Sequence, residues 1–194
     1  VQGDQAESLL AGQTVTLEAV VTRVTADGFY LMEESSDFDD SDATSEGVYI
    51  YTGGSYSAEV ADLISVTGTV AEFFGQTQLS GISDVTVVTE GYGVPAPVEI
   101  TLGPDIAIDY EAVEGMLVNV TAAGDPLTVI ENYNLARYGQ IVVSSGTQTT
   151  PTQIYDAQTQ QAELQAQQEA AQKVMPHYFE KYKTDGVDHN IYIG

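Results

Sequence analysis

The stretch GQTVTLEAVVTRVTADGFYLM, residues 12–32, decides the fold of the first half of this chain. Between Thr14 and Thr22 apolar and polar residues alternate, which is typical of a strand with one buried face. Asp27 and Gly28 then supply a turn, and four apolar residues follow it directly. Two such segments joined by a glycine-containing connection predict a β-hairpin.

Further strand-like segments follow this hairpin in a recognisable order. An acidic, serine-rich loop leads into a third strand at residues 47–51. After a short connector, residues 64–80 predict a second hairpin, with a bend at Gly68 and a turn at Gly75. A hairpin, a third strand, a connector and a second hairpin make the plan of a five-stranded Greek-key barrel of the OB type.

The second half of the chain repeats this plan imperfectly. EGMLVNVTAAGDPLTVIENY, residues 114–133, parallels residues 12–34. GQIVVSSG, residues 139–146, parallels GVYIYTGG, residues 47–54. The last two strands of the plan do not recur before the sequence ends, so the repeat predicts a second barrel that is incomplete.

The fold class that we predict is mainly β, with tandem OB-fold-like Greek-key barrels of which the second is incomplete. Residues 1–92 form the first barrel, 93–97 a proline-containing linker, and 98–194 the second, OB-like domain. A Gln/Ala-rich helix at about residues 157–175 belongs to the second domain, because this segment has almost no β-branched residues.

Composition restricts the possible functions. There are 29 acidic and five basic residues, and the formal net charge is −24. Such a surface disfavours tight binding of phosphate backbones and suits salty surroundings or cation binding. Cysteine is absent, which excludes disulfides and cysteine-based zinc sites. No apolar run approaches the roughly 20 residues of a membrane span, so we expect no membrane insertion.

Six segments together carry a resemblance to a known family. They are GQTVTLEAVVT, DATSEGVYIYTGG, VTGTVAEFFGQTQLS, EGMLVNVT, ENYNLARYGQIVVSSG and PTQI, between Gly12 and Ile154. In combination they resemble the non-catalytic OB-fold region of large secreted bacterial nucleases, the ExeM-like and YhcR-like group. In that family the region precedes a catalytic domain, of which these 194 residues contain nothing. The resemblance therefore implies a secreted, extracellular protein whose chain is not itself an enzyme.

Aromatic residues of the first barrel are the candidates for nucleic-acid binding. OB folds bind single strands on the face of strands two and three, where aromatic rings stack on bases. The candidates are Tyr30, Tyr49, Tyr51 and Phe74. Ordinary packing of tyrosine in a barrel wall is the alternative, and the shortage of positive charge predicts that single-stranded DNA or RNA would bind only weakly.

The acidic loop is the candidate metal site. Carboxylates at alternate positions of a loop suit calcium or another divalent cation, although the full EF-hand pattern is absent. The candidate ligands are Asp37, Asp39, Asp40, Asp42 and Glu46. A solvated loop without a bound ion is the alternative.

A polar corner in the second half interrupts two strand-like runs, Leu127 to Glu131 and Ile141 to Val143. We predict that its side chains hold the connection between these strands in place by stacking and hydrogen bonding, rather than contacting a ligand. The residues of this structural corner are Asn132, Tyr133, Asn134, Arg137 and Tyr138.

The function that we expect from these patterns is that of a non-catalytic OB-fold module of a secreted nuclease-like protein, which positions nucleic acid or neighbouring domains. Its partners would be a downstream nuclease domain or another copy of itself. The alternative is an extracellular structural module that self-associates by strand addition, because an unfinished barrel leaves strand edges unpaired. A hydrolase is a third possibility, but neither histidine has a partner at the spacing of a known catalytic motif.

Overall fold

The computed structural model describes residues 1–3, 7–34, 36–38, 41, 43–73, 75–103, 105–133, 135–138 and 141–147. These residues are mainly β, as predicted. One compact unit comprises Val1–Glu99 and Asp109–Asn119, and the second comprises Ile100–Ile108 with the described residues from Val120 onward. The Gln/Ala-rich helix predicted near residues 157–175 lies outside the described residues, and the division at 93–97 stays a prediction.

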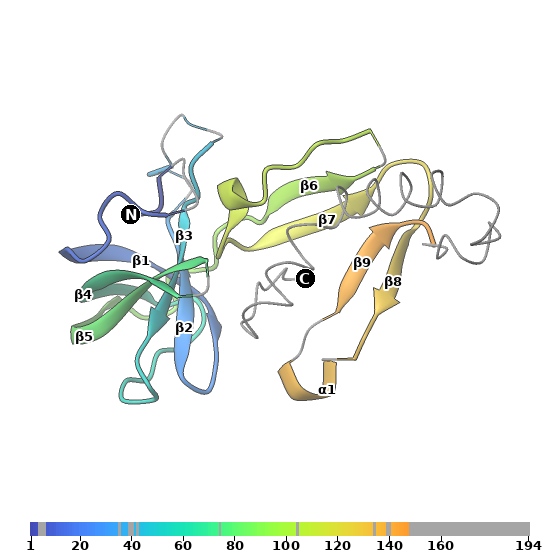
Figure 1. Ribbon diagram of the computed structural model, residues 1–194. Helices are drawn as coiled ribbons and strands as arrows, with labels where there is room; N and C mark the ends of the chain where they lie inside the picture. Colours follow the sequence, from blue (N-terminus) through green and yellow to red (C-terminus); the bar gives the residue numbers. More distant parts are fainter. Residues whose placement is uncertain are drawn as a thin grey trace. The chain divides into compact units, whose positions relative to one another are not determined.

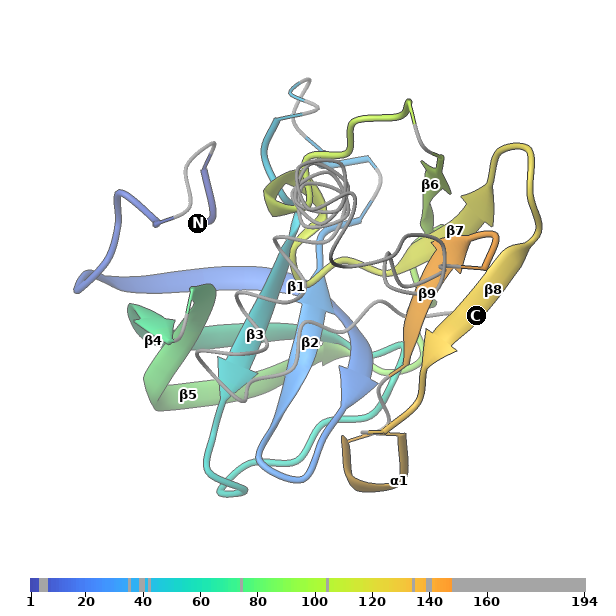
Figure 2. The ribbon, with the colours of Figure 1, turned by 45° about the vertical axis from the view of Figure 1, so that its right-hand side comes forward.

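Five strands of the first unit close into a barrel (Figure 1). They are β1 (Thr14–Val24), β2 (Gly28–Met32), β3 (Gly47–Tyr51), β4 (Leu63–Phe73) and β5 (Gln76–Thr89). The order around the barrel is β1-β2-β3-β5-β4, and β1 pairs with β4 to complete the ring. The ladders of the barrel are antiparallel except that of β3 with β5, which is parallel. Figure 2 shows β2 and β3 side by side. The predicted five-stranded barrel is therefore confirmed.

Alternation along the strands builds the barrel core. In β1 the residues Ala19 and Val21 point inward, while Thr14 and Thr16 lie on the exposed side. Each fully buried aliphatic or aromatic side chain contributes about 1.5–3 kcal/mol. The buried core cluster consists of Ala19, Val21, Phe29, Leu31, Val48, Ile50, Ile64, Val66, Val70 and Leu79. All ten residues come from the five barrel strands.

The residues that follow β5 are hydrogen-bonded to the connector between β3 and β4. The Gly91 amide donates to Oδ1 of Asp62 at 2.9 Å, and the Gly93 amide donates to the Ala61 carbonyl at 3.0 Å. Ala61 has a φ of 78°, a left-handed conformation that costs a residue with a Cβ about 1–2 kcal/mol. The start of the proline-containing stretch is thus held at both of its glycines.

The remaining strands form two ladders. β6 (Val98–Leu102) pairs with β7 (Val118–Ala122), and a short 3-10 helix, η1 (Glu111–Val113), lies between them in the sequence. β8 (Leu127–Glu131) pairs antiparallel with β9 (Val142–Ser145).

The two strand-like runs predicted around the polar corner are therefore present, and they pair with each other. The four-residue helix α1 (Leu135–Tyr138) lies in their connection. The second, incomplete barrel stays a prediction, because the described residues after Glu99 contain only these two-stranded ladders outside the first barrel.

Candidate functional site

The outward face of β2 and β3 carries a row of residues fixed by the strand register. Residues two apart on a strand share a face, so Gly47, Tyr49 and Tyr51 lie on one side of β3. The opposite side, with Val48 and Ile50, belongs to the barrel core. We call Gly47, Tyr49 and Tyr51, together with their β2 partners Met32, Tyr30 and Gly28, the outward row.

Two of the predicted nucleic-acid-binding tyrosines form a buried pair in this row. Tyr30 and Tyr49 lie directly opposite each other, and their ring centroids are 4.7 Å apart at 45°. Only 2% of Tyr30 and 8% of Tyr49 is exposed. Nε2 of Gln76 donates to the Tyr30 hydroxyl at 3.3 Å. In this structure neither ring offers an open face to a base, because both are packed against protein.

Tyr49 also fastens the β1–β2 turn. Its hydroxyl donates to Oδ1 of Asp27 at 2.8 Å and lies 3.0 Å from the Thr25 hydroxyl. The ring passes over Gly28, where a Cβ would come within 2.6 Å of the Tyr49 hydroxyl oxygen. Burial, together with the neighbouring Asp27 carboxylate, raises the pKa of Tyr49 above the ordinary value of tyrosine. Glycine at position 28 is therefore required for the ring to lie here.

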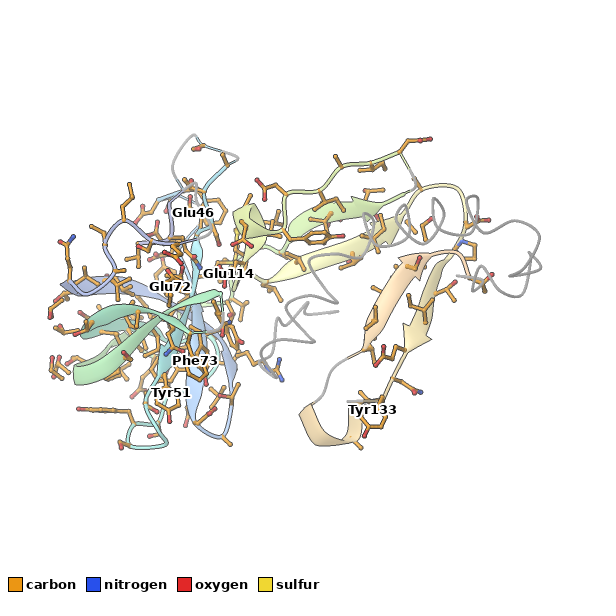
Figure 3. The ribbon with its side chains drawn as sticks, viewed as in Figure 1. Glu46, Tyr51, Glu72, Phe73, Glu114 and Tyr133 are labelled. Carbon is orange, nitrogen blue, oxygen red and sulfur yellow. The ribbon has the colours of Figure 1, made fainter. Side chains whose placement is uncertain are left out.

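Two aromatic side chains near this face are exposed. Tyr51, at the end of β3, is 44% exposed. Phe73, at the end of β4, is 47% exposed and pairs with Gln76, the residue that contacts Tyr30 (Figure 3). Phe74, the fourth predicted candidate, lies outside the described residues. Phe73 was not among the predicted residues, although its place beside the Gly75 turn could have suggested an outward position.

The segment Asp109–Asn119, which we call the strap, crosses the Gly47 end of the outward row. A Cβ on Gly47 would overlap the Gly115 carbonyl carbon and would lie 2.5 Å from the Met116 amide nitrogen. Gly115 has a φ of 72°, which favours glycine. The two glycines thus allow backbone to lie against backbone, and Met116 is almost fully buried there.

One strap residue, Glu114, accepts hydrogen bonds from the N-terminal segment, from Ser45 and from β5. Its carbonyl accepts from the Ser45 hydroxyl at 2.6 Å and from Nε2 of Gln2 at 3.4 Å. Its carboxylate Oε1 accepts from the Thr77 amide at 3.2 Å. Gln2 also donates to the Gly47 carbonyl at 2.7 Å. The N-terminal segment, the strap and the start of β5 are therefore joined around one residue.

A second glutamate lies close to these contacts. Oε1 of Glu72 accepts from the Ser8 amide and from the Thr77 hydroxyl, both at 2.8 Å (Figure 3). Its other oxygen, Oε2, is buried without a hydrogen-bond partner. A buried carboxylate oxygen without a donor costs about 1–3 kcal/mol or more. Glu72 therefore stabilises the N-terminal segment through one oxygen and loses hydration at the other.

The acidic loop begins and ends with two glutamates. The Glu33 amide donates to the Glu46 carbonyl at 3.0 Å. Burial and the adjacent Glu46 carboxyl group raise the pKa of Glu33, and Asp37 adds to the effect. Of the predicted ligands, Asp39, Asp40 and Asp42 lie outside the described residues. Within the described ranges, no group of three or more acidic, histidine or cysteine side chains is placed to hold a metal ion.

The predicted structural corner is only partly described. The Leu135 amide donates to the Asn132 carbonyl at 3.1 Å, which starts α1. Tyr133 is 85% exposed, so its ring does not pack into the corner in this structure. Asn134 lies outside the described residues, as do the side chains of Arg137 and Tyr138, although both belong to α1. The role predicted for these side chains stays a prediction.

No family model matches the chain, and no curated protein matches it either. Among solved structures, the hypothetical protein YgiW from E. coli matches with 17% sequence identity and a TM-score of 0.30. The match covers 43% of this chain and 83% of that one. None of the helices in the described part of the chain has the length and apolar character of a membrane span.

Proposed function

We propose that this chain is a non-catalytic OB-fold module of a secreted nuclease-like protein, which positions single-stranded nucleic acid or neighbouring domains. The observation that carries the proposal is the closed barrel in the order β1-β2-β3-β5-β4. Its strands β2 and β3 carry the outward row, which contains Tyr30, Tyr49 and Tyr51. In OB folds this is the face that takes single strands. The catalytic domain of such a protein would be a partner of this chain.

The exposed aromatics limit how the ligand would be held. Tyr51 and Phe73 are the described side chains with open ring surface next to the row. Stacking of one base on an aromatic ring is worth about 1–3 kcal/mol and does not depend on base identity. With a net charge of −24, the electrostatic contribution opposes binding. The proposal is therefore weak, sequence-tolerant binding that depends on stacking.

Calcium or another divalent cation extends this proposal. A cation bound by the acidic loop would reduce the repulsion between the chain and phosphate groups. The contact between Glu33 and Glu46 supports this, because two adjacent carboxyl groups favour either a shared proton or a bound cation. Isothermal titration calorimetry with calcium, without oligonucleotide, measures whether the chain binds the cation.

Fluorescence anisotropy with a labelled single-stranded oligonucleotide tests nucleic-acid binding at low salt, with and without calcium. We expect weak binding that is lost in Tyr51→Ala and reduced in Phe73→Ala. Tyr92→Ala is the control, because Tyr92 is an exposed aromatic residue next to the predicted linker and outside the outward row. Absence of binding by the wild type under both conditions would refute the nucleic-acid part of the proposal.

Self-association by strand addition is the second candidate function. It is favoured by the two-stranded ladders β6–β7 and β8–β9, because a ladder of two strands is marginally stable until further strands are added. An added strand could come from another copy of the chain. Size-exclusion chromatography with light scattering tests this, and a monomer at every concentration would argue against it.

A further inference from the structure

The strap occupies part of the surface that the proposed ligand would need. Gly47 begins the outward row, and the Gly115–Met116 peptide lies directly against it. Residues two apart on a strand are about 7 Å apart, so the strap ends roughly one side chain away from Tyr49. The strap therefore closes the Gly47 end of the row to an extended ligand.

The barrel does not depend on the strap for its core. Neither the ten residues of the core cluster nor the six partly buried residues packed against it come from Asp109–Asn119. The five strands also close into a ring without it. The strap is instead held by the glycine contact and by hydrogen bonds around Glu114, and its residues Met116 and Val118 are buried.

We propose that the strap is a displaceable cover of the outward row. When docked, it closes the Gly47 end and restricts a ligand to the end that carries Tyr51. When released, it uncovers Met32 and the Gly47 end, while the barrel stays folded. This inference rests on the proposed function only for the identity of the ligand. The cover itself is defined by contacts within the first compact unit.

Gly47→Ala in the full chain tests this directly. The new Cβ cannot coexist with the Gly115–Met116 backbone, so the strap must leave. Hydrogen exchange measured by mass spectrometry should then show amides of residues 110–118 exchanging at least about tenfold faster, while amides of β1–β5 keep their protection. Oxidation of Met32 by peroxide should also accelerate, because Met32 is completely buried in the docked state.

Two further variants make the result decisive. Glu114→Ala removes the acceptor of the Thr77 amide without adding an atom at Gly47, and it should give a smaller increase in strap exchange. Gly103→Ala is the matched control, since its Cβ would meet side-chain atoms of Ile106 at 3.0 and 3.2 Å and of Ala123 at 3.4 Å and no atom of the strap, and it should leave strap exchange unchanged.

Either of two results would overturn the proposal. One is unchanged strap exchange and Met32 oxidation in both strap variants. The other is loss of protection in β1–β5 together with the strap, which would make the strap an integral part of the barrel. Oligonucleotide binding is measured separately on the same proteins. We expect tighter binding by Gly47→Ala than by the wild type; no binding by any of them would refute the nucleic-acid function, while exchange and oxidation still decide the cover.

Discussion

Tyr49 links the outward row to the turn that starts β2. Its ring packs on Tyr30, and its hydroxyl reaches Asp27 and Thr25. Because these contacts join two strands and a turn, a change at this hydroxyl should alter the stability of the whole barrel rather than that of one loop.

Tyr49→Phe should lower the free energy of unfolding by about 0.5–1.5 kcal/mol, the value of one or two hydrogen bonds. The raised pKa of Tyr49 means that the folded state keeps this proton better than the unfolded state does. The corresponding stability is present below the ordinary tyrosine pKa and is lost as the pH rises above about 10. Urea unfolding from pH 7 to 11 checks both points.

Tyr51→Phe is the control for this substitution, because Tyr51 is exposed. It should leave the free energy of unfolding nearly unchanged. Equal losses in the two variants would contradict the role given to the Tyr49 hydroxyl.

Glu33→Gln should stabilise the protein at pH 7. The raised pKa of Glu33 means that the folded state favours its protonated form, so its favourable contribution is present at low pH and lost as the pH rises through the raised pKa. At pH 7 the ionised Glu33 faces Glu46 and Asp37, with the N-terminal amine as the opposing charge. The advantage of the variant should shrink toward pH 4.

Chemical denaturation at pH 4 and pH 7 measures this difference. Glu18→Gln makes the same change in net charge at an exposed position of β1. A similar gain in both variants would attribute the effect to net charge alone.

At the scale of elements, sequence reasoning found the strands better than it found what covers them. Alternation of polar and apolar residues located β1, and the Asp27-Gly28 turn followed by four apolar residues located β2. All five residues of β2 are buried, however, so the same pattern could not show that Tyr30 is packed against protein. The missing information was the set of contacts between elements: Tyr49 and Gln76 pack against Tyr30, and the strap lies against Gly47, a position far from it in the sequence.

Glu72→Ala should release the N-terminal segment from the β4–β5 hairpin. The variant loses two hydrogen bonds, from the Ser8 amide and the Thr77 hydroxyl, but it also removes the buried oxygen that has no partner. We expect a net loss of about 1–2 kcal/mol. Hydrogen exchange should localise the change to residues 7–10.

Glu72→Gln separates the contribution of the hydrogen bonds from that of the negative charge. The amide oxygen can keep both hydrogen bonds while the charge is removed, so stability should stay closer to that of the wild type. A loss as large as that of the alanine variant would show that the charge itself is needed.

At the scale of the whole molecule, charge should govern the response to salt. With a net charge of −24, self-repulsion destabilises the compact state, and raising the ionic strength from about 0.01 to 0.1 M shortens the Debye length from about 30 to 10 Å. We expect the melting temperature to rise over this range in scanning calorimetry. A flat response would mean that the acidic side chains are too far apart to repel one another appreciably.

Calcium chloride at the same ionic strength is the comparison for this measurement. A larger rise with calcium than with sodium would indicate binding at the acidic loop rather than screening. The charge composition of the sequence indicates a protein suited to salty surroundings or cation binding. It could not place the carboxyl groups that meet at Glu33 and Glu46, because that contact depends on where β2 ends and β3 begins.

The contact between Gly47 and Gly115 has an evolutionary consequence. A Cβ at Gly47 would overlap the strap backbone, and Gly115 provides the positive φ that brings this backbone close, so neither position is selected independently. In a lineage that keeps the strap, a mutation at either glycine should be purged. In a lineage that has lost the strap, position 47 should drift toward the β-branched and aromatic residues that strands favour. Covariation of these two positions would thus record which descendants kept the strap.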